Sequence, residues 1–137
     1  MTDSLKDKIL KEMVSDKKNA LERNFELAKN FVEVTPEGKV NVLLNSNKKI
    51  EAKDNLRLYM IGKLYAKEAE LCKSEAVSNE ELTKELGLPE GTVRRALKEL
   101  RDSNKIVQVS SGIHAIKSNL LERFLNEIAQ KVGEKNE

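Results

Sequence analysis

The chain has 137 residues and a formal net charge of +2, and 39% of its residues are hydrophobic and 35% charged. This composition excludes a disordered chain and a membrane-spanning one, and the length fits one domain at ~100 to 200 residues per domain. One cysteine, Cys72, and one histidine, His114, cannot form an internal disulfide or a clustered zinc site, so we expect no metal and no cofactor.

The sequence also lacks signals for membrane insertion or export. No apolar run approaches the ~18 residues of a spanning helix, and Met1-Thr2-Asp3-Ser4 does not begin a basic and then apolar leader. We therefore expect a cytoplasmic protein with no membrane partner.

Residues 3–31 have the periodicity of an amphipathic helix. Apolar residues recur at spacings of four and seven, at Leu10, Val14, Leu21 and Ala28. Lys17 and Asn24 occupy positions where a strict heptad would be apolar, so a coiled coil is weakly specified. Ser15-Asp16 can cap a second helix, and the sequence leaves one helix or two open.

The next segment predicts a β-hairpin. Two runs with alternating apolar residues, 31–35 and 39–44, flank Pro36-Glu37-Gly38. Proline presets φ at the corner and Gly38 permits a positive φ, as a turn requires. Asn45-Ser46-Asn47 then ends the second run.

Residues 53–72 predict a second helix, which Asp54 or Asn55 can cap and which is apolar on more than one face. Such a helix is buried on two sides, so we expect it at the centre of the fold, between the C-terminal half and either the hairpin or a second subunit. Gly62 lies in its middle at a cost of roughly 1 kcal/mol against alanine, which is tolerable where another part of the chain approaches closely.

Two short helices joined by a tight turn follow. Ser78 and Glu81 form a capping box, and the helix that they begin ends at Gly87, the expected left-handed residue. Leu88 is placed to enter the core, and Pro89 suits the first turn of the next helix because it has no N–H to leave unpaired.

The helix of residues 89–103 has one apolar face, made by Val93, Ala96, Leu97 and Leu100. The opposite face carries Thr92, Arg94, Arg95, Lys98, Glu99 and Asp102. Two predicted strands, 105–109 and 113–116, then flank the turn Ser110-Ser111-Gly112. A helix, a helix-turn-helix and a hairpin follow one another in this order in a winged helix.

Residues 78–100, with 106–116 as the wing, resemble the winged helix-turn-helix DNA-binding transcription regulators of small prokaryotic and archaeal type. The resemblance covers residues 55–117 and is specific for the fold rather than for a subfamily. It implies that the helix from Pro89 to Ser103 enters the major groove of double-stranded DNA, and that the hairpin tip touches phosphate or the minor groove.

The local charge agrees with that implication. Residues 91–105 hold five cations and two anions, a net of +3, whereas residues 78–90 hold one cation and four anions, a net of −3. Cations on the second helix can neutralise phosphates or reach guanine, and Glu99 can either accept from cytosine or pair with Arg95. The hairpin tip has no Lys or Arg, so phosphate contacts there fall to serine hydroxyls, the Gly112 N–H or Lys117. The predicted DNA-binding residues are Thr92, Arg94, Arg95, Lys98, Glu99, Lys105, Ser110, Ser111 and Lys117.

We interpret the remaining candidate residues as structural. His114 on a strand is an ordinary half-buried histidine, and Tyr59, Met60 and Tyr65 belong to the core more often than to an effector pocket. The sequence has no catalytic triad, no carboxylate pair in an apolar frame and no glycine-rich phosphate loop, so we expect no enzyme.

The last predicted helix, residues 118–132, has Ser118 as its N-cap and a wide apolar stripe, and residues 133–137 form a frayed tail. The stripe can pack within the chain or against a second copy, and a homodimer is the expected assembly.

The predicted fold class is mainly α with small β-hairpins: a winged helix-turn-helix with extra N- and C-terminal helices. We divide it into an N-terminal extension (1–52), the winged helix domain (53–117) and a C-terminal helix with its tail (118–137). The predicted function is sequence-specific transcription regulation by a cytoplasmic homodimer. The alternative is a winged-helix interaction module that docks an unknown protein partner through its acidic helix and apolar stripes, and a weaker alternative is RNA binding.

Overall fold

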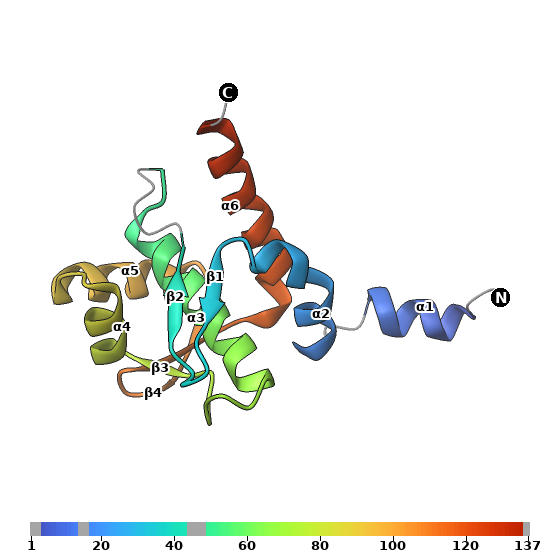
Figure 1. Cartoon of the computed structure of the whole chain (residues 1–137), viewed down its shortest axis with the longest axis horizontal. Coiled ribbons are helices and arrows are strands. Elements are labelled where there is room, and N and C mark those ends of the chain that lie inside the picture. The colour runs from blue at the N-terminus through green and yellow to red at the C-terminus, as the bar shows by residue number, and fades with distance from the viewer. Residues whose placement is uncertain (1–3, 14–16, 44–48, 136–137) are drawn as a thin grey trace.

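The computed structural model describes residues 4–13, 17–43 and 49–135, which fold into helices with two small antiparallel sheets (Figure 1). This confirms the predicted fold class. The elements are α1 (Leu5–Glu12), α2 (Lys17–Ala28), β1 (Val32–Val34), β2 (Val40–Val42), α3 (Ala52–Glu68), β3 (Val77–Ser78), α4 (Asn79–Leu86), α5 (Glu90–Asp102), β4 (Ile106–Ser110), β5 (Ile113–Ile116), the short 3-10 helix η1 (Ser118–Leu120) and α6 (Leu121–Lys135).

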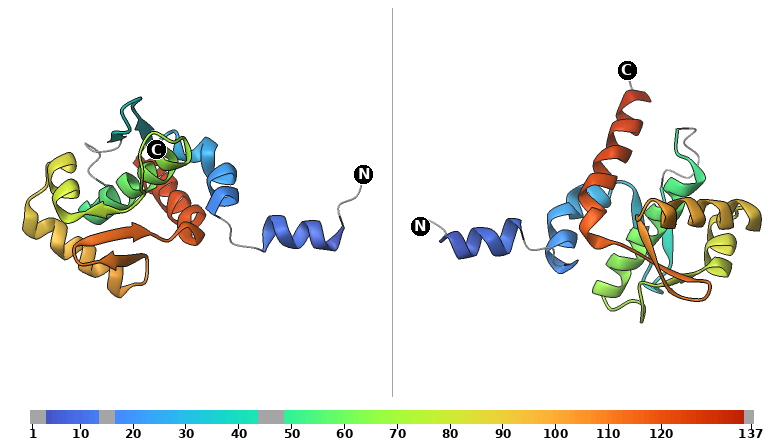
Figure 2. Two further views of the ribbon diagram at one scale, coloured as in Figure 1. Left: turned by 90° about the horizontal axis from the view of Figure 1, so that it is seen from below. Right: turned by 180° about the vertical axis from the view of Figure 1, so that it is seen from behind.

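The N-terminal periodic segment forms two helices, which resolves the alternative that the sequence left open. The Ser4 hydroxyl caps α1 by accepting from the Asp7 N–H at 3.1 Å. The proposed cap at Ser15-Asp16 lies outside the described residues. α1 extends away from the rest of the molecule, whereas α2 packs against α3 and α6 (Figures 1 and 2).

α3 is the central helix, as predicted, and eleven of its 17 residues are buried. It begins one residue earlier than predicted, and its N-cap is Glu51 rather than Asp54 or Asn55. Asp54 occupies the third helical position, where its carboxylate accepts from the Glu51 N–H at 3.1 Å. The helix ends at Glu68, four residues before the predicted end, because Glu70 takes a left-handed φ of 62° and the Leu71 N–H bonds back to the Ala66 carbonyl.

The predicted hairpin is confirmed, and it covers one side of α3. β1 pairs with β2 in the register Val32↔Val42 and Val34↔Val40, and Gly38 has a φ of +84° at the turn. Val40 packs directly over Gly62 of α3, so closely that a Cβ at Gly62 would overlap its side chain. The close approach expected at Gly62 is therefore made by the hairpin.

α4, α5 and the β4–β5 hairpin pack on α3 from the other direction. The sequence did not reveal β3, whose Val77 and Ser78 pair with His114 and Ile113 of β5. The sheet order is thus β3-β5-β4, so the strand that precedes α4 holds β5 at the end next to the hairpin turn.

The C-terminal helix differs from the prediction at both ends. Ser118 is the first residue of η1 rather than an N-cap, and α6 continues to Lys135 where a frayed tail was expected from residue 133. The apolar stripe of α6 is buried within the chain at Leu121, Phe124, Leu125 and Ile128. One continuous core, from Ala20 to Ile128, runs through all three predicted segments.

Enlarging Gly62 should destabilise the fold, since Val40 is β-branched and has little freedom to move away. We expect Gly62→Ala to lower the free energy of unfolding by roughly 1 to 3 kcal/mol, measured by urea denaturation. Gly91→Ala is the matched control, because a Cβ there meets open space and alanine favours the helix. An equal loss in the control, or no loss in Gly62→Ala, would contradict the packing described.

Candidate nucleic-acid interface

The acidic first helix of the pair, α4, is held to α3 by a buried hydroxyl. The Tyr59 hydroxyl donates to Glu81 Oε2 at 2.6 Å, and Lys63 pairs with the same oxygen at 3.2 Å. Burial and the bond to Glu81 together raise the pKa of Tyr59 far above its ordinary value. Ser78 accepts from the Glu81 N–H at 3.0 Å as predicted, but the Glu81 carboxylate turns to α3 instead of back to Ser78.

The turn between α4 and α5 is the predicted one. Gly87 has a φ of 66° and its N–H bonds to the Thr83 carbonyl, and Leu88 packs against the core. Pro89 is the N-cap of α5 rather than a residue of its first turn. Because these contacts fix both ends of the turn, α5 projects its apolar face onto α3 and its charged face outward.

The predicted inward and outward faces of α5 are confirmed. Val93, Ala96, Leu97 and Leu100 are buried, whereas Arg94, Arg95, Lys98 and Glu99 are exposed and Thr92 is half-exposed. The ion pairs show which of these cations are available for binding, and the net charge does not. Arg94 pairs with Glu90 at 3.6 Å and Lys98 with Asp102 at 2.9 Å, each one turn apart. In the described part of the chain, the Arg95 guanidinium is exposed and has no ion-pair partner.

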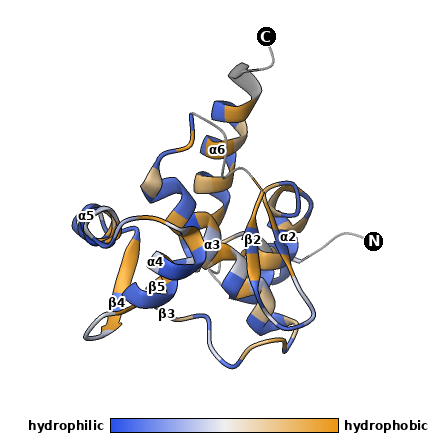
Figure 3. Ribbon diagram, turned by 60° about the vertical axis from the view of Figure 1, so that its left-hand side comes forward, coloured by the Kyte–Doolittle hydropathy of each residue, from blue (hydrophilic) through white to orange (hydrophobic). Residues whose placement is uncertain are grey.

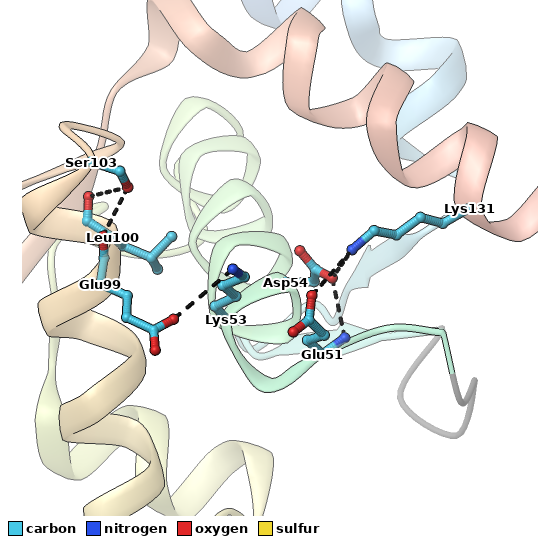
Figure 4. Close-up of polar contacts among 7 residues, drawn as sticks. All are labelled: Glu51, Lys53, Asp54, Glu99, Leu100, Ser103 and Lys131. Carbon is cyan, nitrogen blue, oxygen red and sulfur yellow. Dashed lines mark hydrogen bonds and ion pairs between the residues drawn. The ribbon is translucent and has the colours of Figure 1, made fainter.

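Glu99 does not pair with Arg95, one of the two roles considered for it. Its carboxylate lies 3.9 Å from Lys53 of α3, as Figure 4 shows. Lys105 is half-buried at the same place, where it lines a polar cavity between α3, α5 and α6. Lys117 is also half-buried, just after β5. Among the predicted cations, Arg95 is therefore the one most available to an approaching polyanion.

The β4–β5 hairpin presents hydroxyl and apolar groups at its surface. Ser110 and Ser111 are exposed at the tip, and Gly112 takes a φ of +71° to close the turn. Val107 and Val109 are 42% and 60% exposed on β4, which is coloured hydrophobic in Figure 3. The hairpin lies on the same side of the molecule as α5 and away from α1 (Figures 1 and 2).

His114 anchors the hairpin to α4 and is fully buried, not half-buried as expected. Its Nε2 lies 2.9 Å from Asn79 Oδ1, and because an amide oxygen can only accept, the ring donates from Nε2. Nδ1 is buried without a hydrogen-bond partner among the described residues. Burial, with a smaller effect from Arg101, lowers the pKa of His114, so the ring is held neutral.

The arrangement can be compared with known protein families. Residues 69–107, which include β3, α4, α5 and the start of β4, match the model of winged helix-turn-helix DNA-binding domains. The chain carries a winged helix-turn-helix domain. The match spans under a third of the chain, and the searches of curated proteins and of solved structures each found no match.

The winged helix domain extends beyond the matched residues at both ends, because α3 forms its first helix and β5 completes the wing. DNA binding is the function that this match supports. In the described part of the chain, no helix is long and apolar enough to cross a membrane, and no cluster of His, Cys, Asp or Glu could hold a metal ion.

Sequence reasoning missed the contacts that orient the winged helix domain. Tyr59 was assigned to the core, and its side chain is indeed buried, but no spacing indicated that its hydroxyl would reach Glu81 22 residues later. The Asn79–His114 contact spans 35 residues. A polar end on a residue of an otherwise apolar helix face was the available signal for Tyr59.

The buried neutral His114 should make stability depend on pH. Its folded pKa lies below the unfolded value of about 6.5, so the unfolded chain binds more protons as the pH falls. We expect the contribution of His114 to be complete above about pH 7 and to be lost progressively as the pH drops through ~6.5 toward the folded pKa.

Urea denaturation of the wild type and His114→Gln, at several values between about pH 5 and pH 8, measures this contribution. Glutamine retains a donor near the position of Nε2 and does not titrate, so the difference between the two proteins isolates the histidine. A difference that stays constant across the series would show that His114 is not held neutral.

Proposed function

We propose that the protein is a sequence-specific DNA-binding transcription regulator that inserts α5 into the major groove. The observation that carries the proposal is the position of Arg95 on the outward face of α5, exposed and without an ion-pair partner in the described residues. A guanidinium in this state is free to form a bidentate pair with guanine O6 and N7.

The neighbouring side chains on this face suit different kinds of contact with DNA. Arg94 and Lys98 are screened by Glu90 and Asp102, so they suit phosphates, whose charge can displace weak exposed pairs. Thr92 lies three residues before Arg95 and on the same side of the helix, and its hydroxyl suits a base edge or a phosphate. The uncharged tip of the wing restricts its contacts to the Ser110 and Ser111 hydroxyls and the Gly112 N–H, which limits the sequence-independent part of the affinity.

We also propose that the protein acts as a homodimer, in which α1 of each chain docks on the other. Leu5, Ile9, Leu10 and Met13 are between 39% and 79% exposed, and they share one face of α1. An apolar pocket of about 440 Å³, lined in part by Phe25, Ala28, Val32, Tyr65 and Ala69, lies between α2, β1 and the end of α3. Lys6 lies within the apolar face of α1, and the pocket is lined by Lys29 as well as by Glu33 and Glu68. The apolar areas of the two surfaces, rather than their charges, therefore support the docking.

A protein-interaction module remains a second candidate because of two exposed apolar features. One is the apolar face of α1, and the other is the pair of valines, Val107 and Val109, on the wing. The apolar stripe of α6, which this alternative also used, is occupied within the chain. A chain that ignores duplex DNA and binds one protein in a fixed ratio would establish this second function.

Replacing Arg95 should weaken specific DNA binding. After selection of a preferred duplex from random sequences, we expect Arg95→Ala to weaken its binding by about 1 to 3 kcal/mol and to relax preference at one base pair, as measured by fluorescence anisotropy. For the wild type, the logarithm of the affinity should fall linearly with the logarithm of the salt concentration. Arg94→Glu/Arg95→Glu should not bind.

The matched control is Lys73→Glu/Arg123→Glu, which changes the net charge equally at exposed positions in the loop after α3 and on α6. This control should bind almost as the wild type does, since long-range charge is screened over ~10 Å at 0.1 M salt. Equal loss in both double variants would remove α5 from the interface, and preference for duplex RNA as a competitor would reassign the nucleic acid.

Light scattering tests the dimer independently of DNA. We expect twice the chain mass at micromolar concentration for the wild type, and the monomer mass for Leu10→Asp, because an aspartate would be buried without a partner. Glu122→Gln on α6 is exposed and serves as the control. A monomeric wild type would contradict the assembly without bearing on the DNA contacts of a single winged helix.

A further inference from the structure

A polar cavity lies beneath α5, on the side away from the outward face of that helix. It has a volume of about 170 Å³ and is bounded by α3, the C-terminal half of α5 and α6. Figure 4 shows several of its lining residues, with Glu99 on α5, Ser103 at the C-cap of α5 and Lys131 on α6. Four cations, Lys53, Arg57, Lys105 and Lys131, face four anions, Glu51, Asp54, Glu99 and Glu127.

Most of these charges have partners within the protein. Lys131 pairs with Asp54 at 2.6 Å and with Glu51 at 3.6 Å, and Lys53 lies 3.9 Å from Glu99 (Figure 4). The Ser103 hydroxyl donates to the Glu99 and Leu100 carbonyls. Arg57 is the buried cation of the lining that these contacts leave without a partner among the described residues.

Arg57 is 5% exposed, and its guanidinium lies over the Phe124 ring at 3.7 Å from the ring centre. Its Nε has no hydrogen-bond partner in the described part of the chain, where no carboxylate forms an ion pair with it either. Glu127 and Asp54 act on it only through longer-range attraction, and burial lowers the pKa of Arg57 despite them. A guanidinium stays charged in proteins, and a buried charge without hydrogen bonds is strongly unfavourable.

The charge of the cavity and the shape of the guanidinium indicate which kind of ligand could bind Arg57. A carboxylate matches the planar fork of a guanidinium with two parallel hydrogen bonds. The evenly balanced lining disfavours a phosphate dianion, because Glu127 and Glu99 would repel the second charge. The Phe124 ring covers one face of the guanidinium and blocks the approach of a ligand from that side.

We propose that this cavity is a binding site for a small monocarboxylate, held by the guanidinium of Arg57. Binding at this site does not depend on DNA binding, so a negative result for one of the two proposals would leave the other unaffected. Lys105, predicted from the sequence as a DNA-binding residue, also lines this cavity and would face the bound carboxylate.

The side-chain Nε–H signal of Arg57 in nitrogen-15 correlation spectra reports directly on the site. Titration with propionate should shift this signal and the backbone amides of residues 99–103 until saturation. Propionamide has the same shape without the charge, and it should bind at least about tenfold more weakly. Inorganic phosphate should also bind more weakly than propionate, and sodium chloride at equal ionic strength is the blank.

Two variants sharpen the test. Glu127→Gln removes an exposed competing carboxylate and should tighten propionate binding roughly two- to fivefold, without disturbing a buried residue. Arg57→Met should abolish binding, read from the amides of residues 99–103, and the exposed Arg123→Met on the same helix as Phe124 should leave it unchanged. Equal responses to propionate, propionamide and chloride, or no response to any, would overturn the proposal and assign the stabilisation of Arg57 to water.

Discussion

The burial of α3 is the constraint on which the rest of the structure depends. A helix with eleven buried residues out of 17 cannot be stable in isolation, because its apolar surface must be covered on more than one side. The β1–β2 hairpin covers the side that contains Gly62, and α4 and α5 cover another. The winged helix domain therefore cannot be separated from the N-terminal extension without exposing part of its own first helix.

The orientation of α5 follows from this same constraint. Tyr59 places a polar group at the edge of the buried face of α3, and Glu81 binds it from the first turn of α4. Hydrogen bonds to a carboxylate are stronger than neutral ones, and this one is partly shielded from water. Gly87 then fixes the turn. The contacts of α3 and α4 therefore determine the direction of α5, which carries the residues that would contact DNA.

Local signals predicted the elements well and the long-range contacts poorly. Ser78, Gly87 and the spacing of Val93 and Leu97 act within one or two helical turns, and the structure confirms each of them. β3 is only two residues long, so it has no periodicity to detect, and its existence depends on His114 and Ile113 far along the chain. The early end of α3 depends on the left-handed Glu70, a residue with no intrinsic preference for that conformation.

The charge of the candidate interface shows a similar limit. A count of residues 91–105, which run from α5 to the residue before β4, gives a surplus of three positive charges, but the structure places these cations in different surroundings. Arg94 and Lys98 are paired along the helix, and Lys105 lines the cavity below it. Spacing along a helix reveals the first two pairs, since acidic residues lie four positions away, whereas the position of Lys105 depends on how α6 packs.

One helix thus borders two chemically different surfaces. The outward face of α5 carries Arg95, exposed and available to a polyanion, while Glu99 and Ser103 at its C-terminal half border the cavity that contains Arg57. The buried face between them is rigid, because Val93, Leu97 and Leu100 pack tightly in the core. A group bound in the cavity would therefore act on α5 as a whole rather than on one side chain, since a packed helix moves as a unit or not at all. The cationic cavity residue and the cationic outward residue belong to α3 and α5, and α3 is the element that positions both.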